Sequence, residues 1–194
     1  MEYKDRLLPK PKDWTHKIWT GRKTGTYKWY EVQDPIAYFE EFEKPKILFQ
    51  EIATYQAFAW DESGAYSNNK TFIIPNADFY LLGLLNSSLI WHFLNQVASK
   101  LQGGALAMQT PYTFQIPIVS EDEETKAAIT SLVKQILNIK QADAAADTSA
   151  LESEIDLLVY RLYRLTYDEV LLVEPDFALS RAAYESAATV SQPR

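Results

Sequence analysis

Residues 71–100 read TFIIPNADFYLLGLLNSSLIWHFLNQVASK, and this stretch decides the fold class. Its first four residues are aromatic or β-branched and stop at a Pro-Asn pair, which predicts a short strand. From residue 79 to residue 100, large apolar residues recur at spacings of three and four, which predicts one long helix with a broad apolar stripe. A strand followed by a packed helix indicates an α+β fold.

Further strands are predicted on both sides of this stretch. Residues 27–30, 46–53 and 56–60 are rich in aromatic and β-branched residues with partial alternation. Residues 112–119 also resemble a strand, and their flanking and internal prolines mark it as an edge or irregular strand. Together with residues 71–74, these segments predict a small mixed β-sheet.

A helical tail is predicted in the last third of the chain. Apolar residues at helical spacing run through residues 129–137 and 151–162, and a short third helix is expected at about residues 168–173. Beyond residue 182 large apolar residues are scarce, so we expect fraying there.

Two of these helices carry a start signal. Ser149 with Glu152, and Thr166 with Glu169, have the spacing of a capping box, in which the two side chains bond to each other's backbone N–H groups.

The composition excludes several kinds of site. The 194-residue chain has no cysteine, which excludes disulfides, thiolate metal sites and cysteine nucleophiles. The first 13 residues carry charge and proline, so we expect no signal peptide. The longest apolar candidate, residues 79–97, is interrupted by six polar residues and predicts a packed helix with no membrane partner. We expect a cytoplasmic protein.

Charge is distributed unevenly along the chain. The net charge of -7 argues at first against a nucleic-acid partner. However, residues 1–30 hold eight Lys or Arg against three acids, whereas residues 119–194 hold seven basic residues against fourteen acidic ones. This asymmetry suggests that the N-terminal segment faces phosphate and that the tail faces solvent or protein, although a solvated charge run is the commoner explanation.

Residues suited to catalysis are scarce. Histidine occurs only at positions 16 and 92, which leaves little for a metal cluster or a Ser-His-Asp triad. Glu124 with Lys126 resembles the end of a nuclease metal motif, and the paired acids Glu40 and Glu41 invite a hydrolase interpretation. A solvated helix start and a solvated surface segment explain these two patterns more simply.

The remaining polar side chains are of the kinds that bind DNA. Arg and Lys can approach the acceptors of guanine, Asn and Gln can form paired hydrogen bonds with adenine, and Lys and Tyr can hold phosphates. The candidate DNA-binding residues are Arg22, Lys23, Lys28, Tyr30, Lys44, Lys46, Gln50, Asn68, Asn69, Lys70, Lys100, Gln102 and Gln109.

Several short segments together resemble one known family by their order and spacing. They are residues 28–31 (KWYE), 44–47 (KPKI), 49–52 (FQEI), 69–74 (NKTFII), 81–89 (LLGLLNSSL), 115–118 (QIPI), 154–160 (EIDLLVY), 162–163 (LY) and 165–166 (LT). The set resembles the TaqI-like C-terminal specificity domain over roughly residues 27–173. That family supplies sequence recognition in type II restriction-modification enzymes.

The resemblance implies two partners, double-stranded DNA and an N-terminal methyltransferase domain of the parent protein. That domain would carry the S-adenosylmethionine site and an Asn-Pro-Pro-Tyr-type motif for adenine N6 methylation. This sequence has no Pro-Pro pair, so we expect a noncatalytic fragment or separate specificity piece without a cofactor of its own. The catalytic domain would flip the target adenine while this chain reads the flanking bases.

We expect the chain to divide into three parts. Residues 1–119 would form the target-recognition α+β domain with its basic N-terminal segment, residues 120–176 a helical tail packed on it, and residues 177–194 a poorly ordered C-terminus. The loops at residues 63–70 and 100–109 would read bases, because loops tolerate the variation that new specificities require.

Some side chains are expected to hold the fold instead. Asn86 should bond within the fold, and Asp156, Tyr160 and Tyr163 should lock the tail onto the sheet domain. Strand parity puts Lys44, Lys46 and Gln50 on one face, which favours them for DNA contact.

Two other function classes stay open. One is a protein-interaction or scaffold module of a defence complex, which would act through its acidic tail without direct DNA binding. The other is an enzyme that uses the carboxylates named above.

Overall fold

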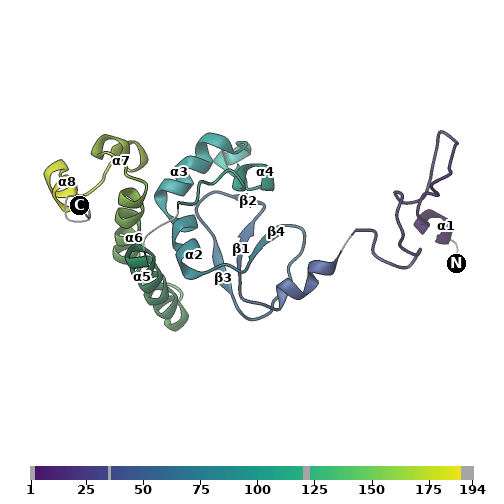
Figure 1. The fold of residues 1–194 in the computed structure, drawn as a ribbon, viewed down its shortest axis with the longest axis horizontal. Coiled ribbons are helices and arrows are strands. Elements are labelled where there is room, and N and C mark those ends of the chain that lie inside the picture. The colour runs from purple at the N-terminus through teal and green to yellow at the C-terminus, as the bar shows by residue number, and fades with distance from the viewer. Residues whose placement is uncertain (1–2, 35, 120–122, 189–194) are drawn as a thin grey trace. The chain divides into compact units, whose positions relative to one another are not determined.

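The computed structural model describes residues 3–34, 36–119 and 123–188. The chain forms two compact units, Met1–Glu41 and Phe42–Arg194. The second unit contains the strands and the longer helices (Figure 1). Residues 119 and 176, where we expected domain boundaries, both lie inside this second unit.

The first unit is organised around Arg22. Beyond helix α1 (Lys4–Leu7), the N–H of Arg22 donates to the Leu8 carbonyl at 3.0 Å, and the Lys10 N–H donates to the Arg22 carbonyl at 3.1 Å. The Arg22 guanidinium donates at 2.8–3.2 Å to the carbonyls of Leu7, Lys28, Trp29 and Glu31. The predicted strand at residues 27–30 is therefore wrong: its carbonyls accept from a side chain, and residues 29–30 form a turn. A 3-10 helix, η1 (Ala37–Phe42), lies where this unit ends.

The second unit contains a three-stranded antiparallel sheet of order β3-β1-β4. The central strand is β1 (Lys46–Gln50), which pairs with β3 (Ala59–Asp61) and β4 (Thr71–Pro75). Ile47 lies opposite Trp60 on one side and Ile74 on the other. The α+β class is confirmed, and the ladders of the named strands are antiparallel where we expected a mixed sheet.

At Glu51 the chain changes strand partner. The Glu51 N–H donates to the Lys70 carbonyl at 2.9 Å, while its carbonyl accepts from the Met108 N–H at 2.8 Å. Beyond it, β2 (Ile52–Ala53) pairs with β5 (Leu106–Ala107) in a second antiparallel ladder. The strand predicted at residues 46–53 is therefore two strands. β5 was not predicted because two residues are too short to show periodicity.

The single helix predicted at residues 79–100 is wrong, because it is broken in two. α2 (Phe79–Asn86) begins at Asp78, whose side chain accepts from the Leu81 N–H, and α3 (Ser88–Val97) follows immediately. Ser87 between them is extended, with φ -69° and ψ 151°. Its hydroxyl donates to the Leu84 carbonyl at 2.7 Å and accepts from the Ile90 N–H, so one serine ends the first helix and caps the second.

The strand predicted at residues 112–119 is also wrong. A 3-10 turn, η2 (Gln102–Gly104), leads to β5, and after it comes a helical turn, α4 (Thr110–Thr113). Pro111 lies at the start of α4, where a missing N–H costs no helical hydrogen bond. Pro111, one of the two prolines that suggested an irregular strand, therefore starts a helix instead, and Pro117 lies beyond that helix.

The helical tail consists of α5 (Glu123–Ala142), α6 (Ser149–Leu162), α7 (Tyr167–Val173) and α8 (Arg181–Ala188). α5 packs on α2 at Gly83, where a Cβ would lie 2.6 Å from Cγ2 of Ile129 and 3.0 Å from Cγ2 of Val133. The core includes residues of the sheet, of α2 and α3 and of α5 and α6, and Ile47, Leu84, Ile129 and Val159 in it are fully buried.

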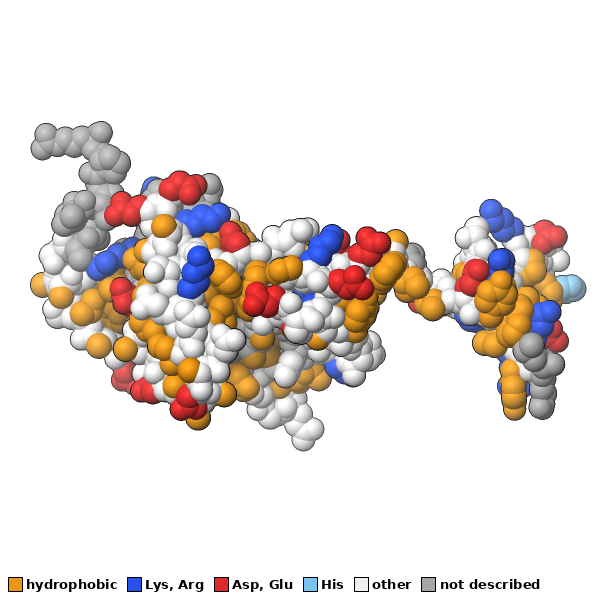
Figure 2. All heavy atoms as spheres, turned by 90° about the horizontal axis from the view of Figure 1, so that it is seen from below, with side chains coloured by type: hydrophobic (Ala, Val, Ile, Leu, Met, Phe, Trp, Pro, Cys, Tyr) orange, Lys and Arg blue, Asp and Glu red, His pale blue; other side chains and the backbone are white. Residues whose placement is uncertain are grey.

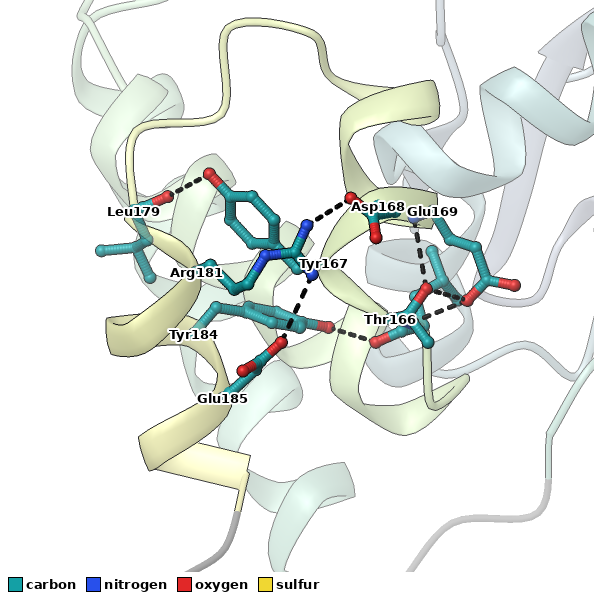
Figure 3. A network of polar contacts seen from close by, with 9 residues as sticks. Thr166, Tyr167, Asp168, Glu169, Leu179, Arg181, Tyr184 and Glu185 are labelled. Carbon is teal, nitrogen blue, oxygen red and sulfur yellow. Dashed lines mark hydrogen bonds and ion pairs between the residues drawn. The ribbon is translucent and has the colours of Figure 1, made fainter.

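The ends of the tail differ in part from expectation. The capping box of Thr166 and Glu169 is confirmed. At the start of α6 the Thr148 hydroxyl, rather than that of Ser149, bonds to Glu152, at 2.5 Å. α8 lies where we expected fraying, because buried Tyr184 anchors it by donating to the Leu165 carbonyl at 2.9 Å (Figure 3). Arg181 adds ion pairs to Asp168 and Glu185.

Within the described ranges, no helix is long and apolar enough to cross a membrane.

Candidate nucleic-acid interface

Two of the predicted loops meet where β1 ends and β4 begins. Gln50 pairs with Thr71, and the Thr71 N–H donates to the Asn68 carbonyl at 3.2 Å. The bond from Glu51 to the Lys70 carbonyl holds the same loop from the other side. Gln50, Asn68, Asn69 and Lys70 are therefore gathered at one end of the sheet, and all four are exposed.

The second loop joins this end through β5. The bond from the Met108 N–H to the Glu51 carbonyl brings Gln109 beside the end of β1. The Ala107 N–H donates to the Ser99 carbonyl at 3.0 Å, and the Leu101 N–H donates to the Ala105 carbonyl at 2.7 Å. We call the exposed set the sheet-end surface; its members are Gln50, Asn68, Asn69, Lys70, Lys100, Gln102 and Gln109.

Local hydrogen bonds and glycines shape these loops. The Asn68 side chain accepts from the Lys70 N–H at 2.9 Å, which forms a tight turn. Gly103 and Gly104 have φ of 78° and 79°, a left-handed conformation that side chains other than glycine rarely adopt. Nothing lies within 4 Å of a Cβ built on either glycine, so the conformation, and not crowding, requires glycine there.

The positive charge of the sheet-end surface is partly neutralised by a neighbouring carboxylate. The Lys70 ammonium lies 2.7 Å from the Glu51 carboxylate, in a pair whose lysine side chain is 66% exposed. On the face of the second unit seen in Figure 2, acidic and basic side chains are interspersed with apolar ones. Of the seven members of the sheet-end surface, five carry amides and two are lysines, so amides outnumber positive charges there.

Apolar side chains near the sheet-end surface were missed by the sequence analysis. Ile52 is 49% exposed, Leu101 39% and Phe114 86%. Phe114 ends α4, which the pair of Tyr112 and Ser99 hydroxyls at 2.5 Å ties to the second loop. A useful signal was the position of Phe114 between two prolines, in a segment that we interpreted as a strand.

Two predicted residues of the second unit lie elsewhere. Lys46 is 0% exposed, and its ammonium donates to the Phe42 carbonyl and to the Asp61 carboxylate. The hydrogen bond from Lys46, with further bonds from Ser63, lowers the pKa of Asp61. Lys44 is exposed but precedes β1, so the length of the strand, roughly 17 Å, separates it from Gln50. The alternation of side chains along a strand, extended through Pro45, therefore wrongly predicted that Lys44, Lys46 and Gln50 share one surface.

The predicted residues of the first unit form their own arrangement. Arg22 uses its guanidinium on four backbone carbonyls and lies 4.8 Å from the Tyr27 ring centre. Lys23 pairs with Asp34, while Lys28 lies 3.8 Å from the Glu31 carboxylate and 5.6 Å from the ring centre of Tyr30. Lys23, Lys28 and Tyr30 are exposed, whereas Arg22 organises the unit from within.

Asn86, Asp156 and Tyr163 hold the fold as expected, whereas the Tyr160 hydroxyl donates to the Glu174 carboxylate at 3.0 Å, within the tail. The Asn86 amide accepts from the Phe58 N–H at 3.1 Å and donates to the carbonyls of Phe58 and Leu82. Asp156 on α6 accepts from the N–H and the hydroxyl of Ser88, each at 2.7 Å. The Tyr163 hydroxyl donates to the Pro117 carbonyl at 2.5 Å, so the tail is fixed to the sheet-bearing part of the second unit.

Among the described residues, the pattern that suggested a nuclease does not gather further metal ligands. Lys126 lies 3.2 Å from Asp78, and Glu124 is exposed in the first turn of α5. In the part of the chain that the structure describes, no three His, Asp or Glu side chains are grouped as a metal site would need.

A small antiparallel sheet with polar loops gathered at one end has the form of a binding module, in which a rigid scaffold presents variable loops. The family model of the TaqI-like C-terminal specificity domain matches residues 10–118, more than half of the chain. The chain belongs to this family of specificity domains. The match includes the whole sheet-end surface, and α5 to α8 lie outside it. The resemblance that we noted at residues 154–166 therefore stays a prediction.

Proposed function

We propose that this chain is the sequence-specific double-stranded DNA recognition module of a restriction-modification adenine-N6 methyltransferase. The observation that carries the proposal is the sheet-end surface, where seven of the candidate residues, from the end of β1 and from two loops, come together inside a TaqI-like specificity domain. The module itself is noncatalytic, works in the cytoplasm, and acts with a methyltransferase domain that holds S-adenosylmethionine.

The side-chain chemistry of the sheet-end surface suits base reading. Gln50, Gln102 and Gln109, with Asn68 and Asn69, offer amides that can pair with adenine edges, and Lys70 and Lys100 can approach guanine or phosphate. These side chains lie at the end of β1 and on loops that two ladders hold at the same sheet end, so they can be presented together to a groove. Lys46 contributes to the stability of the scaffold and not to DNA contact.

The first unit would supply phosphate contacts. Its exposed Lys23 and Lys28 add positive charge without base-reading geometry, and contacts of this kind position a protein on DNA without specifying sequence. The methyltransferase domain would flip the target adenine out of the duplex while the sheet-end surface reads its neighbours.

The test is the affinity of the chain for duplex DNA between about 50 and 200 mM salt, followed by selection of preferred sequences from a random library. We expect affinity to fall steeply with salt. Lys100→Gln and Gln109→Ala should change the selected sequence, whereas Lys134→Gln on α5 should not, although it removes the same charge as Lys100→Gln.

Absence of DNA binding even at low salt, by the chain and by the chain joined to a methyltransferase domain, would contradict the proposal. It would favour instead a scaffold module of a defence complex that acts through its acidic tail.

A further inference from the structure

A cavity of about 520 Å³ lies in the second unit between the α+β part and the helical tail. Residues 55–60 and residues 82–88 at the α2–α3 break supply one side of it, and α5 and α6 supply the other. The cavity therefore exists because the tail packs on the family-matched part of the chain. None of the thirteen candidate DNA-binding residues lines it.

The lining combines apolar walls with acidic groups. Phe58, Trp60, Ile136 and Leu137 are among the apolar residues, while Asp156 and Glu152 contribute carboxylates. No described lining residue is a lysine, an arginine or a histidine. An occupant would thus meet hydrocarbon and aromatic surface together with negative charge.

Most neutral polar groups of the lining are already used by the fold. The Asn86 amide makes three hydrogen bonds, to the N–H and carbonyl of Phe58 and to the Leu82 carbonyl. Within the described part of the chain, each Asp156 oxygen accepts one bond, and both bonds come from Ser88. Because an ionised carboxylate offers about four acceptor sites, Asp156 can accept from a further donor.

The surroundings of Asp156 favour a positively charged donor. Burial is the main cause that raises the pKa of Asp156, and the carboxylates of Glu174 and Glu152 add to it, against the bonds from Ser88. A cation beside Asp156 would compensate this charge, and a charge-assisted hydrogen bond is about twice as strong as a neutral one.

We propose that this cavity binds a small organic cation, namely a primary amine with a compact apolar body. The ammonium donates to Asp156, and the body lies against Trp60 and Ile136. Ligand sites of this volume are typically apolar with a few polar groups that fix orientation, and the Trp60 ring adds apolar contact area for the body. The proposal concerns a site separate from the sheet-end surface and does not depend on DNA binding.

Two matched probes test the proposal by isothermal titration calorimetry on the full chain. 2-Phenylethylamine, a cation at neutral pH, is compared with 2-phenylethanol, which has the same body and a neutral hydroxyl. We expect the amine to bind at least about tenfold more tightly, the advantage that a hydrogen bond to a charged group provides. The N–H resonance of Ser88, which bonds to Asp156, should shift on addition of the amine.

Three variants assign the effect to the cavity. Asp156→Asn keeps an oxygen that can accept from Ser88, and it should reduce the preference for the amine to near onefold. Ile136→Trp should fill the cavity and abolish binding of both probes. Glu154→Gln, an exposed position of α6 outside the lining, removes the same charge and should leave both affinities unchanged.

Equal affinities for amine and alcohol would overturn the proposal, as would an unchanged preference in folded Asp156→Asn. Failure of the amine to bind the native chain at millimolar concentration would do the same. Circular dichroism of each variant establishes that it is folded, and Glu152→Gln, which should weaken amine binding, provides a second charge variant if Asp156→Asn does not fold.

Discussion

Basic residues of this chain divide into those that hold the protein together and those that face outward. Arg22 and Lys46 belong to the first kind, since Arg22 donates to four carbonyls and Lys46 is buried against Asp61. Lys70 and Lys100 belong to the second kind, on the exposed sheet-end surface. Residue type alone therefore says little about whether a lysine or arginine meets DNA.

Replacement of Lys46 should reduce stability. Lys46→Ala removes the partner of Asp61, whose side chain is only 13% exposed, and leaves a poorly solvated carboxylate, so we expect a loss of about 3 kcal/mol. Urea unfolding measures it. Lys46→Met, which keeps the volume of the side chain, should lose less. If Lys46→Ala were as stable as the native chain but bound DNA poorly, the assignment of Lys46 to the scaffold would be wrong.

Asp156 should give stability a characteristic pH dependence. Its pKa in the folded chain is raised above the ordinary value of 3.8, so between these two values the folded state binds more protons than the unfolded state. The free energy of unfolding of the native chain, minus that of Asp156→Asn, should therefore increase as the pH falls from about 7 to about 4. Urea unfolding at several pH values measures this difference, and a decrease over the same range would show that the carboxylate is stabilised by its surroundings.

The helices of the second unit are held together by close contacts and by side chains that cap helix ends. At the α2–α3 break Ser87 ends α2 and caps α3, and Asp156 of α6 accepts from the N–H of Ser88, the first residue of α3. Gly83, one turn before the break, lets α5 approach α2. The packing of these helices thus depends on a few small or polar residues as well as on apolar area.

Gly83→Ala should displace α5. The new Cβ would lie 2.6 Å from Cγ2 of Ile129, inside van der Waals contact, and overpacking of this kind destabilises by about 1–3 kcal/mol. Thermal or urea unfolding measures the loss. In the double variant with Ile129→Ala the clash is relieved, so the combined loss should be smaller than the sum of the two single losses. Strict additivity would indicate that the two positions do not meet.

The same elements show what a sequence can predict. The strand at residues 71–74, the helices α5 to α7 and the Thr166–Glu169 capping box were predicted because their signals are local. The break at Ser87 was not, since Asp156, which is 68 residues beyond Ser88 and accepts from its N–H, contributes to it. The turn at residues 29–30 depends on Arg22 in the same way. Of the candidate site, the exposed loop residues could be named from the sequence, but their convergence depends on the pairing of β2 with β5.

At the scale of the whole molecule, the basic N-terminal segment and the proposed base-reading groups lie in different units. The basic N-terminal segment belongs to Met1–Glu41, whereas the sheet-end surface belongs to Phe42–Arg194. If the former holds phosphates and the latter reads bases, then affinity and sequence preference should be separable by mutation.

The double variant Lys23→Gln and Lys28→Gln tests this separation. Removal of one phosphate-binding lysine should reduce the slope of log affinity against log salt by about 0.9, so the slope of the double variant should fall by up to about 1.8. The selected DNA sequence should stay the same, in contrast to Lys100→Gln. Filter binding across a salt series measures the slope. A changed sequence preference with an unchanged slope would assign base reading to the first unit.

The peptide units on either side of Glu51 connect both loops of the sheet-end surface, since the Glu51 N–H bonds to Lys70 and its carbonyl bonds to Met108. A shift of one loop would be transmitted to the other through this single residue. The residues of both loops would then have to change together for such a domain to acquire a new sequence specificity. Exchange of one loop between relatives should reduce recognition, and joint exchange of residues 68–70 and 99–109 should transfer it.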